Sequence, residues 1–89
     1  MSDQYIIHAK NYDKWARIDV AKAAFEHFKI PYTIHNDGVH WKFIHNNIEY
    51  NYFPTTGKWY TIKPKHSCLD HERYLGGLLR TLGFKFKEI

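Results

Sequence analysis

The chain contains very little cysteine, proline and glycine: of 89 residues, one is cysteine, three are proline and five are glycine. The lone Cys68 cannot form an intrachain disulfide, which argues against a small secreted scaffold and favours a reducing cytosol. The absence of low-complexity runs and internal repeats argues against disorder. No apolar run approaches about 18 residues and residues 1–4 lack a basic start, so we expect neither a membrane span nor a signal peptide.

Aromatic side chains and positive charge are what the chain does have. Three Trp, seven Tyr and six Phe make up 18% of the residues. A chain this short buries only about 60–65% of its unfolded surface, so such large side chains are needed to build a core. We expect one domain over residues 1–89. The formal net charge of +4 favours an anionic partner, although many small cytoplasmic proteins carry this charge with no polyanion to bind.

Apolar residues recur at three- and four-residue steps between residues 13 and 30, which predicts a helix there. Asn11 and Asp13 can cap its first amides, and Pro31 ends it because the residue before proline avoids the α region. Residues 1–10 are expected to form an edge strand or an ordered arm. The aromatic residues expected in the core are Trp15, Phe25, Phe28, Trp41 and Phe43.

Residues 32–62 alternate between apolar and polar positions and predict an antiparallel meander of three to four strands. Its turns are expected at residues 36–38, where Asp-Gly is a strong hairpin signal, at 46–47 and at 54–57. A second helix is expected over residues 68–82, with a capping-type start at Ser67 and Asp70, and residues 84–89 either add a strand or lie over the sheet edge.

These elements predict an α+β two-layer sandwich of the order β?–α–β–β–β–β–α–β?, with both helices on one face of the sheet. The other face would be open, polar and aromatic. The glycine pair at residues 76–77 would allow close packing on the sheet or mark a break in the second helix.

A basic and aromatic surface is the first candidate site. Lysines neutralise phosphates, and aromatic rings stack on exposed bases. The candidate contact residues for nucleic acid or another partner are Lys42, Lys58, Trp59, Tyr60, Lys63, Lys65 and Arg73. Of the sheet tyrosines, we expect Tyr52 and Tyr60 to be the exposed ones; the alternative is that most of these rings are core.

The basic loop before the second helix is the second candidate site. Lys63, Lys65, His66 and Ser67 would hold one phosphate beside the free amides of a helix N-terminus. The alternative is an ordinary solvated loop.

Histidine chemistry gives a weaker candidate. His35, His40 and His45 are spaced by five, which puts successive residues of a strand on opposite faces, so we expect no metal site and no cofactor. His40, close to Lys42, is a candidate general acid or base of a nuclease, for which no partner can be defined. Cys68 has basic neighbours, but we expect a structural thiol.

The segment Tyr-Asn-Tyr-Phe-Pro-Thr-Thr-Gly-Lys-Trp at residues 50–59 resembles a motif of small, largely uncharacterised bacteriophage proteins, in which an aromatic pair precedes Pro-Ser/Thr-Thr-Gly-Lys/Arg-Trp. The resemblance covers residues 31–60 and implies a phage origin and a host-cytoplasm setting, but no activity. The order of elements is also similar to that of double-stranded RNA-binding domains and of HicA-type toxin ribonucleases. The first likeness would give Lys63, Lys65 and Arg73 a role at phosphates, and the second would make His40 catalytic.

Three functions are therefore open. The leading hypothesis is a phage-encoded, non-enzymatic accessory protein that binds the backbone of DNA or RNA. The alternative is a protein–protein inhibitor of a host or anti-phage defence factor, with the aromatic hairpin tip at residues 52–60 as its anchor, because Trp and Tyr dominate hot spots. The third is a His-dependent ribonuclease. Either a monomer or a homodimer is compatible with the sequence.

Overall fold

Helices and antiparallel strands make up most of the fold in a computed structural model, which describes residues 4–7 and 13–89. Two short 3₁₀ segments, η1 and η2, complete it. The elements in chain order are β1 (Ile6–Ile7), α1 (Ala16–His27), β2 (Thr33–His35), η1 (Asn36–Gly38), β3 (His40–His45), β4 (Ile48–Phe53), β5 (Lys58–Thr61), β6 (His66–Ser67), η2 (Asp70–Glu72), α2 (Tyr74–Leu82) and β7 (Lys87–Glu88).

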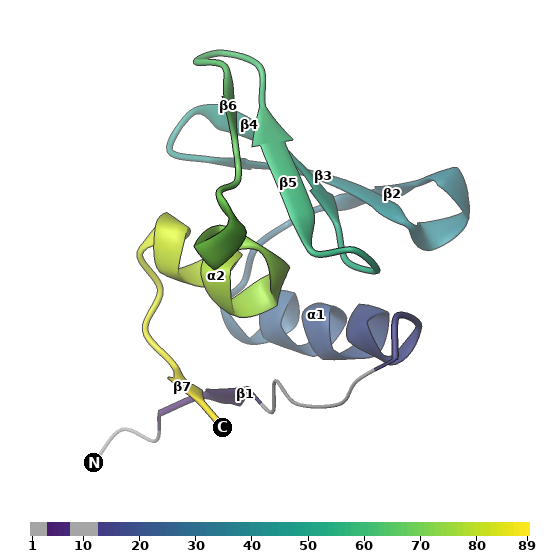
Figure 1. Cartoon of the computed structure of the whole chain (residues 1–89), viewed down its shortest axis with the longest axis vertical. Coiled ribbons are helices and arrows are strands. Elements are labelled where there is room, and N and C mark those ends of the chain that lie inside the picture. The colour runs from purple at the N-terminus through teal and green to yellow at the C-terminus, as the bar shows by residue number, and fades with distance from the viewer. Residues whose placement is uncertain (1–3, 8–12) are drawn as a thin grey trace.

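The main sheet is an antiparallel meander in the order β2-β3-β4-β5-β6. Both helices lie against the same face of it (Figure 1). This confirms the predicted α+β class and the helix-backed meander. The short strand β6 was not expected, and it pairs with the end of β5 through Tyr60↔Ser67 and Thr61↔His66.

Strands β1 and β7 pair with each other in parallel and not with the main sheet. They lie on the far side of the helices from that sheet (Figure 1). The ring of Tyr5 stacks on His27 of α1 at a centroid distance of 4.2 Å, which fastens this ladder to the helix. The expected N-terminal strand therefore exists at residues 6–7, whereas residues 1–3, residues 8–10 and the cap at Asn11 lie outside the described part of the chain.

The core is built around Phe25 of α1. Its ring makes edge-to-face contacts with Trp41 at 5.2 Å and with Phe43 at 5.3 Å, and it stacks on Tyr52 at 5.9 Å. Tyr52 is only 1% exposed, so its predicted exposure is wrong: it shares with Tyr50 the strand face that the helices cover.

Helix α1 begins later than predicted. The Asp13 carboxylate accepts hydrogen bonds from the amides of Trp15 and Ala16 at 2.9 and 2.8 Å, which confirms the cap. Trp15 precedes the helix and is 59% exposed, so its predicted burial is wrong. Because Trp15 precedes the first helical turn, its side chain does not lie on the apolar face that the later turns of α1 pack against the core.

Helix α2 is shorter than the predicted 68–82 because η2 and α2 are separate. At the first residue of α2, Tyr74 has a left-handed φ of 66°, which breaks the helical path from η2. Glu72 Oε1 accepts a hydrogen bond from the Leu69 amide at 2.9 Å, so the capping contact differs from the predicted Ser67–Asp70 pair. A Cβ at Gly77 would meet the backbone of Glu72, so this glycine allows α2 to pack on η2 rather than on the sheet.

Candidate functional site

Four aromatic rings form a row across the sheet face that the helices leave open. The ring of His35 is 5.8 Å from that of His40, measured between centroids. His40 stacks on Phe53 at 4.6 Å and Phe53 on Tyr60 at 6.1 Å, with interplanar angles of 13° and 24°. We call these four residues the ring row, and each comes from a different strand.

The register of the strands brings the ring row together. His35 stands directly opposite His40 across the β2–β3 hairpin. When the β3–β4 register is extended by one pair beyond Trp41↔Tyr52, His40 stands opposite Phe53. Phe53 pairs with Lys58 on β5, so Tyr60, two residues further along, is its diagonal neighbour. Cross-strand and diagonal neighbours are within reach of aromatic side chains, so the row follows from backbone pairing.

Tyr60 ends the row and is its most accessible ring apart from His35. It is 37% exposed, and the residue opposite it on β6 is the small Ser67. Phe53 stacks on one side of the Tyr60 ring, whereas the cross-strand neighbour on the other side, Ser67, is too small to cover a ring. A planar ligand can therefore extend the row at this end.

A buried amide holds the middle of the row in place. Asn51 is only 3% exposed although it lies on the open face. Its Oδ1 is 2.9 Å from His40 Nε2, so that nitrogen carries the proton and donates it. At the outer end, His35 Nε2 lies 2.9 Å from Thr33 Oγ1. These hydrogen bonds fix the imidazole orientations before any ligand arrives.

Predicted lysines flank the row. Lys42 pairs with Thr33 on one side and Asn51 on the other, and Lys58 stands opposite Phe53. Lys63 and Lys65 are exposed in the loop between β5 and β6, beyond the end of β5. Positive charge therefore lies at both ends of β5, with Tyr60 between. This spacing of charge can attract an extended, negatively charged ligand along the strand.

Two predicted contact residues lie elsewhere. Trp59 is 1% exposed, and its Nε1 donates to the Glu72 carbonyl at 2.9 Å, so it is a core residue rather than a contact. Neighbouring strand residues point to opposite faces, which puts Tyr60 outside and Trp59 inside. Arg73 donates to the Thr56 carbonyl at 3.2 Å and lies over the Tyr74 ring at 5.5 Å. It binds the β4–β5 turn and not the ring row.

The Pro-Thr-Thr-Gly turn at residues 54–57 is clamped from both helices. Arg17 of α1 donates to the Thr55 carbonyl at 2.7 Å, and its guanidinium lies 5.0 Å from the Tyr74 ring centroid. The Tyr74 amide donates to the Gly57 carbonyl at 2.8 Å. Gly57 itself has φ of 78°, a conformation that favours glycine. The motif therefore has a structural role: its turn connects the sheet to both helices through these hydrogen bonds.

The basic loop does not open a helix, contrary to the predicted phosphate site. His66 and Ser67 form β6, and α2 starts only after η2, at Tyr74. His66 Nε2 lies 3.7 Å from a Glu72 oxygen. The free amides of α2 are therefore not adjacent to Lys63 and Lys65, which instead extend the basic rim of the sheet.

The tyrosines on the covered face are held neutral. Burial raises the pKa of Tyr52 far above its ordinary value, and the nearby Arg17 opposes this only partly. Burial also raises the pKa of Tyr50, and that of Tyr32, where the charge of Glu26 adds to the effect. These hydroxyls are therefore poor acids or bases near neutral pH.

Within residues 4–7 and 13–89, no three His, Cys, Asp or Glu side chains are grouped so that they could bind a metal ion. The same part of the chain has no helix of sufficient length and apolar character to cross a bilayer.

Sequence reasoning missed Phe53, His35 and Asn51. The rule that steps of five alternate faces holds within one strand, but His35 and His40 belong to two strands joined by a turn. The Asp-Gly turn signal could have identified the His35–His40 pair, because a hairpin centred on that turn places these two residues opposite each other.

Comparisons with known proteins give no match: no family model, no curated protein and no solved structure is significantly similar to this chain.

Proposed function

We propose that this protein binds single-stranded nucleic acid on the open face of its main sheet. The observation that carries the proposal is the ring row, in which His35, His40, Phe53 and Tyr60 cross four strands at centroid distances of 4.6 to 6.1 Å. Aromatic rings on a sheet surface are a recurrent platform for unpaired bases, since every base has a face that can stack.

Charge and geometry together favour a single strand over a duplex. Lys42, Lys58 and the loop lysines flank the row and can neutralise phosphates. The bases of a duplex are stacked on one another, so their faces cannot reach Tyr60 without unpairing. A duplex would use the lysines alone and therefore bind more weakly.

Fluorescence anisotropy with labelled single strands of DNA and RNA and with a duplex of equal length tests the proposal at two salt concentrations. We expect both single strands to bind more tightly than the duplex, and all binding to weaken with salt. Lys22→Ala removes one charge from an exposed position of α1, on the other layer, and serves as a control that should bind normally. Absence of single-strand binding at low salt would reject the proposal.

A second candidate, a metal-free ribonuclease, is favoured by the pairing of His35 with His40 beside Lys42. One neutral imidazole would take the proton of a ribose 2′-hydroxyl while its oxygen attacks phosphorus. The other, as imidazolium, would give a proton to the departing 5′-oxygen, so that the phosphorus–O5′ bond breaks and a cyclic phosphate forms. Lys42 would stabilise the charge on the phosphate.

Labelled RNA incubated with wild type and with His40→Ala distinguishes this candidate from plain binding. Cleavage by the wild type alone supports it, and DNA of the same sequence should stay intact because it lacks the 2′-hydroxyl. Equal integrity of the RNA with both proteins would count against catalysis.

The protein-inhibitor alternative loses one ring of its expected anchor, because Trp59 of the hairpin lies in the core. A pull-down with and without nuclease tests what remains of it. One stoichiometric protein partner that survives nuclease treatment would favour an inhibitor. The expected bacteriophage origin and host-cytoplasm setting stay predictions.

A further inference from the structure

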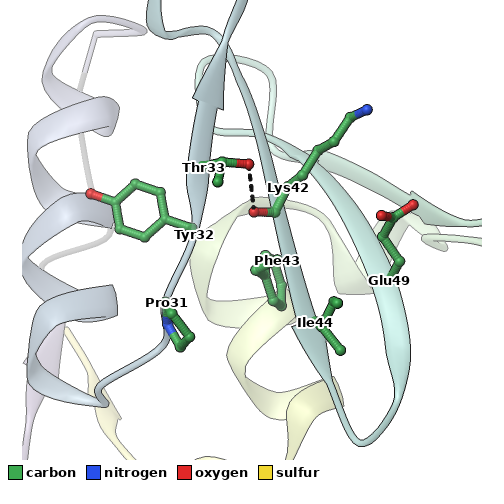
Figure 2. Close-up of a pocket in the computed structure, with 7 residues that line it drawn as sticks. All are labelled: Pro31, Tyr32, Thr33, Lys42, Phe43, Ile44 and Glu49. Carbon is green, nitrogen blue, oxygen red and sulfur yellow. Dashed lines mark hydrogen bonds between the residues drawn. The ribbon is translucent and has the colours of Figure 1, made fainter.

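A hollow of about 340 Å³ opens at the edge of the sheet, where β2 leaves β3 (Figure 2). Its lining mixes an apolar floor with two charged side chains. The lining residues are Pro31, Tyr32, Thr33, Lys42, Phe43, Ile44 and Glu49.

The hollow exists because β2 is shorter than β3. Pairing ends at Thr33↔Lys42, where Thr33 Oγ1 donates to the Lys42 carbonyl at 3.5 Å (Figure 2). The same register would set Pro31 opposite Ile44, and proline has no amide hydrogen for a further ladder bond. Strand β3 continues to His45 without β2 beside it, which leaves room over Phe43 and Ile44.

Lys42 and Glu49 stand at this hollow from neighbouring strands. Lys42 pairs with Asn51 and Ile44 with Glu49, so the two charged residues are diagonal neighbours on the open face. Tyr32 extends to the opposite side, toward α1 (Figure 2). In the part of the chain that the structure describes, the only carboxylates in salt-bridge contact with a basic side chain are those of Glu72, beside His66, and Glu88, beside Arg80. Glu49 is exposed, and its carboxylate makes neither an ion pair nor a hydrogen bond with the described residues.

We propose that this hollow takes one base of the bound strand, a base with an exocyclic amino group, and that Glu49 accepts a hydrogen bond from that group. The inference rests on the proposed binding of single strands. Lys42 lies both beside the ring row and in the hollow, so a strand that follows the row would reach the hollow with a phosphate at Lys42. The apolar floor receives the base.

The Glu49 carboxylate lies on a basic face, where it repels the phosphates that the lysines attract. A hydrogen bond from a base amino group would offset this repulsion, because a carboxylate only accepts hydrogen bonds and the N4 amino group of cytosine only donates them. Uracil has nearly the same size and stacking surface but presents an acceptor oxygen in that place. Glu49 thus favours cytosine over uracil within a surface that otherwise tolerates any base.

Anisotropy titrations of labelled oligocytidine and oligouridine of equal length test the inference. We expect the wild type to bind oligocytidine at least about fivefold more tightly, the lower end of discrimination by a good base contact. Glu49→Ala should bind both with equal affinity, and its loss of a negative charge should strengthen oligouridine binding. Asp19→Asn removes the same charge from exposed α1 and should keep the wild-type preference.

The outcomes separate the two proposals. Equal wild-type affinity for the two oligonucleotides, or a cytosine preference that survives in Glu49→Ala, would overturn the role of Glu49 while leaving single-strand binding intact. Failure to bind either oligonucleotide at low salt would overturn both. Because Glu49 is exposed, its substitution is compatible with folding, which circular dichroism checks.

Discussion

Replacing Tyr60 by alanine is the sharpest test of the ring row. Tyr60 is 37% exposed, stacks on Phe53 at 6.1 Å and has the small Ser67 opposite it on β6. A base stacked on it should contribute about 1–3 kcal/mol. Its removal should therefore weaken single-strand binding about 5- to 140-fold, since 1.4 kcal/mol is a factor of ten.

The same substitution should affect folding much less than binding. A fully buried aromatic residue costs about 3–5 kcal/mol when truncated, and Tyr60 is only partly buried, so its cost should fall well below that range. Urea unfolding of wild type and Tyr60→Ala measures this difference. Fluorescence anisotropy is then measured at urea concentrations below the start of the unfolding transition, where the variant is folded. The measured affinity therefore describes the folded variant alone.

Two matched variants make the result interpretable. Tyr60→Phe keeps the ring and should bind within about twofold of the wild type, because stacking does not need the hydroxyl. Trp15→Ala removes an even more exposed ring that lies outside the row, at the start of α1, and should not change binding. Normal binding by folded Tyr60→Ala, or an equal loss in Trp15→Ala, would refute the reasoning.

Three further predictions concern charge, pH and packing. Lys58→Ala should reduce the slope of log affinity against log salt by about 0.7, the value for one phosphate on a single strand; an unchanged slope in anisotropy titrations would remove Lys58 from the site. The pKa of Tyr52 is higher in the folded than in the unfolded chain, so its contribution to stability is fully present below the unfolded pKa near 10.0 and is lost as pH rises above it. Urea unfolding should show a smaller loss of stability above that pH for Tyr52→Phe than for the wild type, and equal losses would contradict the assigned burial effect. Gly77→Ala should lower the free energy of unfolding by about 1–3 kcal/mol because its Cβ meets the Glu72 backbone, whereas Gly76→Ala meets only the movable Glu88 carboxylate and should cost less.

Much of the fold could be predicted from local pattern. The alternation in residues 39–53 and the turns at 36–38, 46–47 and 54–57 correctly indicated a meander with one covered face. The break before α2 could not be predicted so well, because it depends on tertiary contacts. The Trp59 indole binds the Glu72 carbonyl and the Gly57 carbonyl binds the Tyr74 amide, and both partners are distant in sequence.

The candidate site could be predicted only in outline. The lysines and Tyr60 were expected on the open face, but Trp59 was included wrongly and Phe53 was not selected. Both errors concern which side of a strand faces the helices. Alternation shows that Trp59 and Tyr60 point in opposite directions, yet not which of them is covered.

By itself, the sequence determined the class of the protein: a basic, aromatic, helix-backed antiparallel sheet, because side-chain periodicity and turn residues act over a few neighbouring positions. Only the tertiary structure decided which aromatic residues form the core and which form a surface. Register between strands and the side chosen by the helices are long-range outcomes of packing. They align His35, His40, Phe53 and Tyr60 in one row, and they leave the hollow beside Lys42 and Glu49 where β2 ends.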